Sequence, residues 1–442
     1  MSVETLSPKV SAPLDVVEVG AFTGGIIGPS LKMLGPLKDG GTILAQTAPG
    51  CWGPMITPKF EGGHEVTRPV AVEGASVGDA IALKIKRVEV TSLATSSGVM
   101  QLVEGRYVGD PFVAKLCPKC GTASPPTHLE GIGQQAVHCD VCGAEVSAFR
   151  FTNGYVVVFD RENQVAVTVT KEIAERIAKD ARQFARLPSA SQQHSILSFA
   201  QADIVGLISR MQPFLGNVGT TPSRDLPDSH NCGDFGAFLI NAPHKYGMSQ
   251  EELNRHKTDG HMDANSVRAG AVLICPVKVP GGGIYIGDMH AQQGNGEIAV
   301  HTTDVSGEVE LQAEVIKGLA IDGPILLQRL DDLPPLARPI TPELRAKAQA
   351  LAQRFGGVPL EDNAPITFIG SGPTINDATK NGLERAAKAT GLPADEILNR
   401  ATIAGSIEIA RLPGVARVTF LCPWPVLERM GIAHLVRAQY GL

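Results

Sequence analysis

The sequence predicts an α+β fold in which a β-rich core is followed by a helical C-terminal region. Many turns are expected, because the chain contains 48 glycines and 31 prolines but only 5% aromatic residues. Short strands are expected from segments in which apolar and polar residues alternate, such as 81–86 and 308–316. Helical spacing of apolar residues follows residue 331, and the 442 residues are enough for two or three domains with a large core.

Residues 1–110 form the first of four predicted regions, which is rich in strands and turns. Ile81, Leu83 and Ile85 share one face of a predicted strand. The apolar phase slips by one residue at Arg87, which predicts a β-bulge at this point.

Residues 111–150 contain two CxxC motifs, whose cysteines are Cys117, Cys120, Cys139 and Cys142. A gap of 18 residues separates the motifs and a glycine follows each, so the pattern predicts an inserted four-cysteine zinc ribbon. Four thiolates fill a tetrahedron, so the zinc is expected to be structural. Disulfides or a redox motif are the alternative. The ribbon could brace a subunit contact or cover the active site, and its single lysine and lack of arginine disfavour nucleic-acid binding.

The third region, residues 151–330, is expected to combine helices over 171–215, one at 171–187 and a second after Ser189, with a β-rich catalytic part. A buried strand that passes through Ile286 continues on the same face with Asp288 and His290. A core strand that ends in Asp-x-His holds two side chains rigidly, so both are predicted metal ligands. A solvated hairpin tip with a satisfied histidine is the alternative interpretation.

The Asn-Gly dipeptide at 295–296 is a strong signal for a two-residue hairpin turn, because both positions need positive φ. That turn would place His290 opposite His301. Glu297 and His301 would then share a face with the two predicted ligands. A longer loop would leave Glu297 near the ligands but detach His301.

A second polar cluster occupies residues 259–265 and precedes an apolar strand at 271–277. This strand is expected to neighbour the strand that ends at His290, through the glycine-rich turn at 280–283. The two clusters could then converge, which makes Asp263 a predicted third ligand. Histidine and carboxylate side chains with a bound water suit a zinc-like divalent ion that keeps an open position. The alternative is that Asp263 caps a turn.

A third polar site lies at residues 230–234. Cys232 could be a nucleophile for amide cleavage with a neighbouring histidine as base, although adjacent residues of a strand point to opposite faces. His230 and Asp234 are weaker candidates for supporting the metal. His64 could enter the pocket or lie in an exposed loop, and Trp52 could line an apolar pocket or belong to the core.

Residues 331–442 form the fourth region, a C-terminal α/β region that opens with a proline-rich linker. Helices are expected near 341–355, 376–391 and 424–438. Thr341 is a good N-cap, and the proline that follows it suits the first helical position.

Residues 260–318 contain the element Gly-Asp-Met-His-Ala-Gln-Gln-Gly-Asn-Gly-Glu after Gly-His-Met-Asp. This passage resembles the acetamidase/formamidase family, which carries Gly-Asn-x-Asp, a strand pair and Gly-Asp-x-His-Ala-x-x-Gly-Asp-Gly-Glu. Segments 68–79 and 392–404 resemble other parts of that family. His261 stands where Asn is usual and Asn295 where Asp is usual, so both are expected to affect substrate choice.

The resemblance implies a metal-dependent amidohydrolase that converts a small formamide- or acetamide-like amide to ammonia and a carboxylate, and it implies a homo-oligomer. Asp263, Asp288 and His290 would hold a catalytic divalent ion, with zinc as the expected metal and His301 as a further candidate ligand. Glu297 would carry a proton from water to the leaving amine. The alternatives are hydrolysis of a lactam, urea or guanidine-like substrate, or a non-catalytic zinc-ribbon interaction protein.

Composition favours a soluble cytoplasmic protein, and the small-molecule substrate is what the resemblance implies. The formal net charge of −6 and a pI of about 6.0 argue against general affinity for nucleic acid or anionic membranes. The N-terminus lacks a basic segment followed by an apolar one, and no apolar run reaches the ~20 residues that a membrane helix needs. Eight cysteines, of which four belong to the ribbon, suit a reducing compartment.

Overall fold

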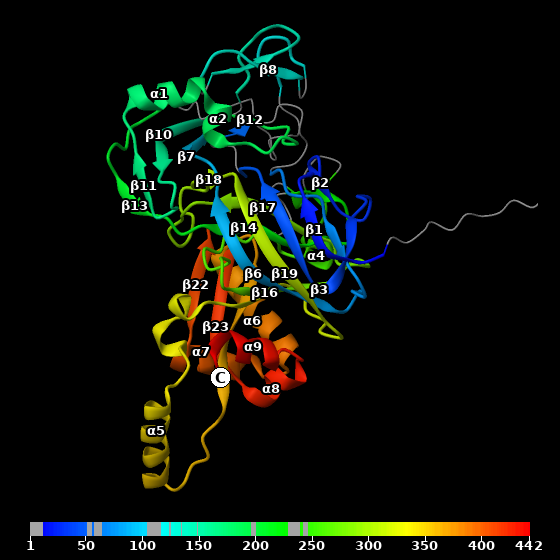
Figure 1. Ribbon diagram of the computed structural model, residues 1–442, viewed down its shortest axis with the longest axis vertical. Helices are drawn as coiled ribbons and strands as arrows, with labels where there is room; N and C mark the ends of the chain where they lie inside the picture. Colours follow the sequence, from blue (N-terminus) through cyan, green and yellow to red (C-terminus); the bar gives the residue numbers. More distant parts are fainter. Residues whose placement is uncertain are drawn as a thin grey trace, which may run out of the picture.

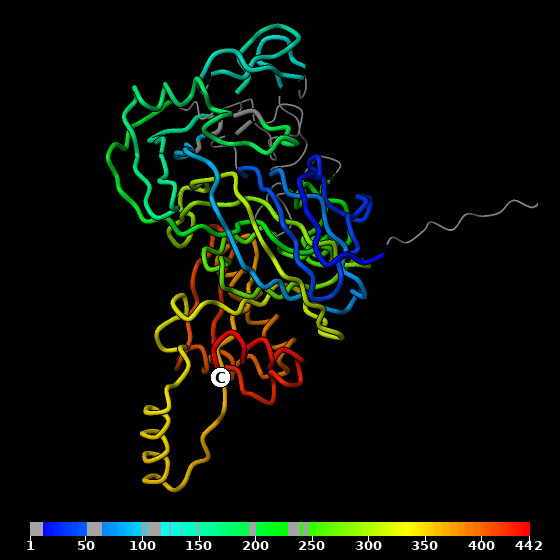
Figure 2. Tube along the Cα trace, in the orientation of Figure 1, coloured from blue at the N-terminus to red at the C-terminus, as the bar shows by residue number. Residues whose placement is uncertain are grey.

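The computed structural model (Figure 1) describes residues 12–50, 55–56, 64–103, 116–122, 125–133, 135–147, 149–195, 200–228, 239–241 and 246–442. The chain trace in Figure 2 shows the blue and green N-terminal strands in the upper part and the orange and red C-terminal elements below them.

A 13-stranded sheet, counted over the described residues, is the central element of the fold. The hydrogen-bonded order of its main path is β14 (Phe214–Thr220), β17 (Ile284–His290), β5 (Val70–Val72), β3 (Leu34–Thr47), β19 (Gly307–Ile316), β6 (Ala80–Val90), β16 (Val272–Pro276), β20 (Ile325–Leu327), β21 (Asn363–Ser371), β23 (Val415–Pro423) and β22 (Ser406–Arg411). Strand β1 (Leu14–Val19) pairs with β3, and β18 (Asp304–Val305) pairs with β17.

The pairing of β6 with β19 confirms the predicted bulge. Glu310 pairs with Arg87 while the next residue, Leu311, pairs with Ile85, so β6 contains one extra residue at this point. Residues of β19 alternate between buried and partly exposed over most of its length, as the sequence pattern predicts.

The predicted adjacency of β16 and β17 is wrong. Strand β17 pairs with β14, β5 and β18, whereas β16 lies between β6 and β20. The glycine-rich connection does not close a hairpin, because its backbone bonds to other strands. Gly281 O accepts from Val72 N, and Gly282 O accepts from Thr221 N, both at 2.9 Å. These bonds hold the connection against β5 and the end of β14.

A smaller sheet lies above the large one in Figure 1. Its order is β13 (Ile208–Arg210), β11 (Val165–Thr168), β10 (Phe149–Phe159) and β7 (Ala94–Leu102). Helices α1 (Lys171–Lys179) and α2 (Ala181–Ala185) join the core of this sheet through Ala174, Ile177 and Ala181. The helical stretch predicted near 171–187 is divided at Asp180, whose φ and ψ of −116° and 34° are not helical. The second helix predicted after Ser189 is wrong, because the described residues of 189–215 form β12 (His194–Ser195), β13 and the start of β14.

Helices α6 (Ile375–Thr390) and α7 (Ala394–Ala404) contact β21 and β23 at the C-terminal end of the large sheet. The predicted helix at 424–438 is broken into α8 (Trp424–Arg429) and α9 (Ala433–Tyr440), because Gly431 takes a φ of 72°. Helix α5 (Pro342–Arg354) projects from the body in Figures 1 and 2. It begins as predicted, with the Thr341 hydroxyl accepting from Leu344 N at 3.3 Å.

The remaining short elements connect these parts. They are β2 (Ile26–Ile27), β4 (Met55–Ile56), β8 (Thr127–Leu129), β9 (Val137–Cys139), β12 (His194–Ser195), β15 (Leu226–Pro227), α4 (Gln250–His256) and two 3₁₀ turns, η2 (Leu330–Asp332) and η3 (Pro335–Ala337). Within the described segments, no helix combines the length and apolar character that crossing a lipid bilayer requires.

Candidate functional site

The end of β17 carries two ionisable side chains into the protein interior. Asp288 and His290 are both fully buried, and His290 Nε2 lies 3.2 Å from Asp288 Oδ2. The His290 ring stacks on Phe214 of β14, with ring centroids 4.8 Å apart, and this contact fixes the imidazole plane. One strand end therefore brings the two predicted ligands together.

Asp263 approaches the same point along β14. Its N–H donates to Gly216 O at 3.1 Å, and the neighbouring His261 forms a β-bridge with Asn217. Asp263 Oδ1 lies 3.3 Å from His290 Nε2. The two polar clusters therefore converge as expected, but β14 brings them together instead of a β16–β17 pair.

Two further histidines complete the arrangement. His261 Nε2 lies 3.0 Å from Asp288 Oδ2 and 3.1 Å from Asp263 Oδ2, while His64 Nε2 lies 3.5 Å from Asp288 Oδ1. The five residues His64, His261, Asp263, Asp288 and His290 are called the buried cluster below. They form two overlapping groups that share Asp288, and within each group the candidate ligand atoms all lie within 4.8 Å of one another.

Two glycines allow this close approach. A Cβ atom at Gly50 would lie 1.6 Å from Asp288 Oδ1, and one at Gly216 would lie 2.3 Å from Asp263 Oδ1 and 2.5 Å from His290 Nε2. No side chain larger than hydrogen fits at either position without moving the carboxylates or imidazoles. The backbone at these glycines forms part of the wall of the buried cluster.

One guanidinium lies against the buried cluster. Arg411 is 2% exposed, contacts an Asp263 carboxylate oxygen and places Nη1 2.9 Å from His261 Nε2. Burial alone would raise the pKa values of the two aspartates. Arg411 and the histidines instead hold the pKa of Asp263 well below its usual range, and His64 and His290 do the same for Asp288.

Several buried atoms of the cluster have no hydrogen-bond partner among the described residues. They include both ring nitrogens of His64 and His290 and both carboxylate oxygens of Asp288. Burial lowers the pKa of His64 to about 3, so its ring is neutral near pH 7 and keeps a lone pair. Adjacent ligands of a divalent ion lie about 3.0–3.4 Å apart when metal–ligand bonds are about 2.1 Å. The donor set and its spacing therefore fit a bound cation.

The predicted hairpin around residues 295–296 is wrong. His290 pairs with Asp304, not with His301, so residues 291–303 form a longer loop. The positive φ values fall on Gly296 and Glu297, at 99° and 39°, and not on the Asn-Gly pair that a type I′ turn needs. As the longer-loop alternative anticipated, His301 stays outside the two candidate ligand groups.

Glu297 and His301 are nevertheless buried, at 4% and 5% exposure. Burial, followed by the Asp263 charge, raises the pKa of Glu297 well above its usual range. Its Oε2 atom has no hydrogen-bond partner among the described residues. The His301 ring contacts Phe151 edge to face at 5.3 Å, and burial lowers its pKa to about 4.

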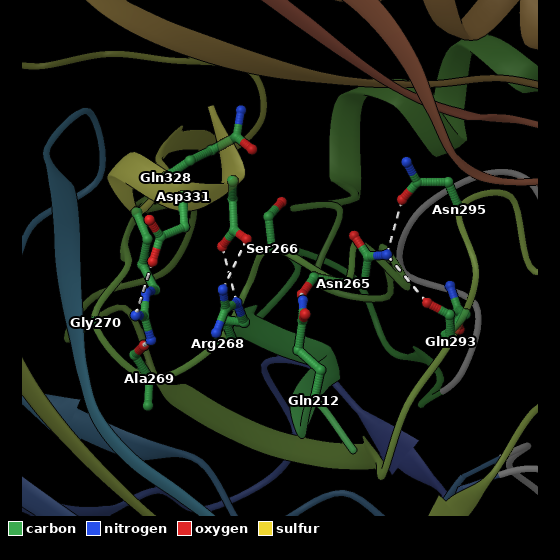
Figure 3. A network of polar contacts seen from close by, with 12 residues as sticks. Gln212, Asn265, Ser266, Arg268, Ala269, Gly270, Gln293, Asn295, Gln328 and Asp331 are labelled. Carbon is green, nitrogen blue, oxygen red and sulfur yellow. Dashed lines mark hydrogen bonds and ion pairs between the residues drawn. The ribbon is translucent and has the colours of Figure 1, made fainter. Parts of the chain in front are cut away.

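A clamp of amide side chains joins the two sequence segments that carry the aspartates (Figure 3). Asn265 Nδ2 donates to Gln293 O at 3.1 Å and to Asn295 Oδ1 at 2.8 Å. Gln293 Nε2 donates back to the backbone oxygen of Asp263 at 2.8 Å. Asp263 has a φ of 46°, which non-glycine residues adopt at a cost, so these bonds help to hold it in place. Asn295, expected to affect substrate choice, also ties one loop to the other.

Two acidic residues that the sequence did not point to lie behind the histidines. Asp304 Oδ1 is 3.5 Å from His290 Nδ1, and Asp228 Oδ1 accepts from the His64 backbone N–H at 3.1 Å. Thr23 donates to the other Asp228 oxygen at 2.8 Å, yet burial raises the pKa of Asp228 to about 7. No local motif identifies either residue. Asp228 contacts a histidine that is distant in the sequence, and Asp304 contacts the histidine that it faces on the paired strand.

The four cysteines of the inserted segment also converge. Their sulfur atoms lie within 4.8 Å of one another, with Cys117 and Cys142 sulfurs 3.5 Å apart. After each CxxC motif a glycine with positive φ donates its N–H to the first cysteine, Gly121 to Cys117 O and Gly143 to Cys139 O. Hydrogen bonds from Thr122 lower the pKa of the Cys120 thiol to about 6, which favours the thiolate.

Four residues singled out in the sequence lie outside the described residues, namely Trp52, His230, Cys232 and Asp234.

Comparison with known proteins gives a family match over most of the chain. The model of the Acetamidase/Formamidase family matches residues 52–391. Among curated proteins, a candidate formamidase of Schizosaccharomyces pombe is 26% identical over 145 residues, an alignment that covers 25% of this chain and 35% of that protein. The chain thus spans about a third of the length of this curated relative.

Solved structures share the fold. A predicted acetamidase/formamidase from Thermoanaerobacter tengcongensis has a TM-score of 0.52 at 17% identity, covering 94% of this chain and 98% of that one. Acetamidases from Bacillus halodurans and Yersinia enterocolitica each have a TM-score of 0.50, at 15% and 14% identity. Both alignments cover 94% of this chain, and they cover 99% of the Bacillus chain and 94% of the Yersinia chain. At sequence identities this low, the likeness shows a shared fold alone. The shared fold agrees with the predicted β-rich core.

Proposed function

The chain belongs to the acetamidase/formamidase family, and on this premise we propose that it is a metal-dependent amidohydrolase. It would cleave the carbon–nitrogen bond of a small linear amide, of formamide or acetamide type, and release ammonia and a carboxylate. One observation carries the metal dependence: buried imidazole nitrogens and carboxylate oxygens lie at cation-ligand spacing and lack hydrogen-bond partners among the described residues.

Asp263, Asp288 and His290 would hold the catalytic ion. Zinc is the expected metal, although this mixture of oxygen and imidazole donors also suits other divalent ions. When bound, such an ion supplies polarisation of the amide carbonyl and a lowered pKa for a water molecule. Arg411 keeps Asp263 ionised and oriented, and the stacked ring of Phe214 keeps His290 in plane.

Glu297 would move the proton. Water oxygen bonds to the amide carbon, the carbon–nitrogen bond breaks, and the proton taken from water goes to the leaving nitrogen. A carboxylate in a buried, negatively charged setting holds a proton more firmly than one in water, and the pKa of Glu297 is raised for this reason. This property suits a group that must accept a proton and then deliver it.

The cysteine cluster is proposed to bind a structural zinc ion. Four thiol groups that converge through two knuckle turns leave no open position for substrate or water. His128 and His138 take other partners, Asp140 at 2.7 Å and Gly143 O at 3.1 Å, so neither is needed as a ligand.

Ammonia release from formamide and acetamide tests the proposal. Hydrolysis of at least one amide should fall to background when a chelator removes the labile ion, and adding zinc should restore it. The D288N variant should lack activity with and without added zinc, whereas E343Q, a change on exposed helix α5, should behave like the wild type. Full activity after metal analysis shows loss of the labile ion would contradict the proposal and favour a cysteine nucleophile, which C232S would then test.

A substrate panel identifies the bond that is cleaved. Formamide and acetamide should be hydrolysed faster than a γ-lactam, urea or a guanidine compound of similar size. Faster hydrolysis of one of these three would keep the metal mechanism and replace the proposed substrate.

A further inference from the structure

We propose that the buried cluster holds two divalent cations bridged by the Asp288 carboxylate, the second ion being bound by His64, His261 and Asp288. The inference rests on the proposed function, because the first ion of that mechanism is bound by the same carboxylate. It adds a second metal position in which Asp288 is joined by His64 and His261, to which the mechanism above gives no ligand role.

The geometry separates the two positions. Asp263, Asp288 and His290 form one candidate ligand group, whereas His64 and His261 form the other with Asp288. Asp288 Oδ1 lies 3.5 Å from His64 Nε2, whereas Oδ2 lies 3.0 Å from His261 Nε2 and 3.2 Å from His290 Nε2. A carboxylate that offers atoms to both groups is the usual bridge of a two-metal site, in which the ions lie about 3.5–4 Å apart.

Unless a second ion is bound, the burial of the His64 imidazole is the hardest feature of the cluster to explain. It is 1% exposed, and neither ring nitrogen has a hydrogen-bond partner among the described residues. Buried polar atoms are rarely left unpaired, because losing water without a replacement partner costs free energy. The backbone of His64 is nevertheless fixed by Asp228, and its ring lies edge-on to His261 with centroids 4.6 Å apart. The fold thus holds an unpaired imidazole against a second imidazole and a carboxylate.

His261 is one of the two residues at which this chain departs from the family elements that it resembles, and it replaces the asparagine of Gly-Asn-x-Asp. An asparagine at this position would offer only a neutral amide oxygen, which is a weak ligand for zinc-like ions. An imidazole is a strong ligand for zinc, copper, iron and nickel. The substitution therefore creates a nitrogen donor where the second position requires one.

Binding of a second ion requires that one contact of Arg411 is broken. Its Nη1 atom lies 2.9 Å from His261 Nε2, and one nitrogen lone pair cannot serve a guanidinium and a metal together. Arg411 retains two other contacts when that one is released, to the Asp263 carboxylate and from Nη2 to His261 O at 3.0 Å. The guanidinium can therefore yield the nitrogen without leaving the site.

The test counts metal ions in the full-length protein after loading with zinc and removal of free metal. Wild-type protein should carry three ions per chain, one at the cysteines and two at the buried cluster. The H261N variant, which restores the family residue, should lose one ion per chain and keep the other two. H301N replaces a neighbouring buried histidine outside both ligand groups, so it should keep all three.

Anomalous diffraction at the zinc edge gives a second readout that needs no variant. Two peaks flanking Asp288 in wild-type crystals would support the proposal. A single peak there, or an H261N protein that still binds two ions at the cluster, would overturn it. The proposed function fails separately, namely if amide hydrolysis survives loss of every ion from the cluster.

Discussion

The cysteine cluster and the buried cluster both gather metal-binding side chains, but they are built in opposite ways. The four cysteines come from one short insertion, and two of them, Cys120 and Cys142, are exposed or partly exposed. The five residues of the buried cluster come from distant segments of the chain, and 226 positions separate His64 from His290. Each of the five is at most 1% exposed. The first site depends on local turns and the second on the packing of a sheet.

The difference has an energetic consequence. At the insertion, glycine turns set the sulfur positions, and we expect the ion itself to supply much of the local stability. In the buried cluster the strands, Arg411 and the amide clamp set the ligand positions before any ion binds. Metal removal should therefore unfold the first site and leave the second largely in place.

The largest effect on catalysis is expected from replacing Glu297, the acidic side chain beside the buried cluster. Replacing Glu297 with Gln removes the proposed proton carrier but keeps its size, so kcat should fall about 10²–10⁴-fold. Bound metal and thermal unfolding should remain close to wild type. Steady-state ammonia release measures the rate, and E343Q serves as a control far from the cluster. Wild-type kcat in E297Q would remove Glu297 from the mechanism.

A second test removes a buried carboxylate that is compensated by two cations. Asp259 is fully buried and contacts Arg385, while Lys257 Nζ lies 3.3 Å from its carboxylate and Ser371 donates to it at 2.9 Å. D259N would leave two cations buried without their counter-charge, so the free energy of unfolding should fall by about 3–5 kcal/mol in urea titrations. The exposed variant D331N should change little.

The pH dependence of stability follows from the same residue. Burial alone would raise the pKa of Asp259, but Arg385 and Lys257 hold it below its unfolded value. A depressed folded pKa gives stability that is present above the unfolded pKa and is lost as pH falls through the folded pKa. Wild-type stability should therefore decline in acid more steeply than that of D259N. Parallel acid profiles for the two proteins would contradict this assignment.

A smaller effect is expected from the acid behind His290. Asp304 lies 3.5 Å from the ring nitrogen that faces away from the cluster, a place from which carboxylates orient metal-binding histidines. D304N should weaken binding of the labile ion by about 10–100-fold, measured by competition with a chromogenic chelator. The D331N protein provides the matched control. Unchanged affinity would show that the stacking on Phe214 alone fixes His290.

The smallest effect on catalysis is expected at the insertion. C120S should release one zinc ion per chain and increase hydrogen exchange in residues 116–147, while kcat for amide hydrolysis stays near the wild-type value. H128N, which alters a neighbouring side chain that contributes no ligand, should retain that zinc. A large fall in kcat for C120S would mean that the inserted segment supports the active site.

Parts of this molecule were predictable because short-range rules decide them. The cysteine knuckles follow from spacing and glycine, the bulge in β6 from a slip in apolar phase, and the start of α5 from a threonine before a proline. Asp288 and His290 meet because strand alternation puts them on one face. The hairpin at Asn-Gly was wrong because the chain bonds elsewhere: Gly296 pairs with Arg411 of β22, and that pairing moves the positive φ to Gly296 and Glu297.

The sequence by itself determined the family, the inserted cysteine motif and three of the side chains in the buried cluster. The tertiary structure decided which strands are neighbours and thereby added His64, His261, Asp304 and Arg411 to the same few ångströms. The physical reason is that local patterns fix the conformation of a strand but not its partner in a sheet. Partner choice depends on the burial of the whole core, and the meeting of residues remote in the chain follows from that choice.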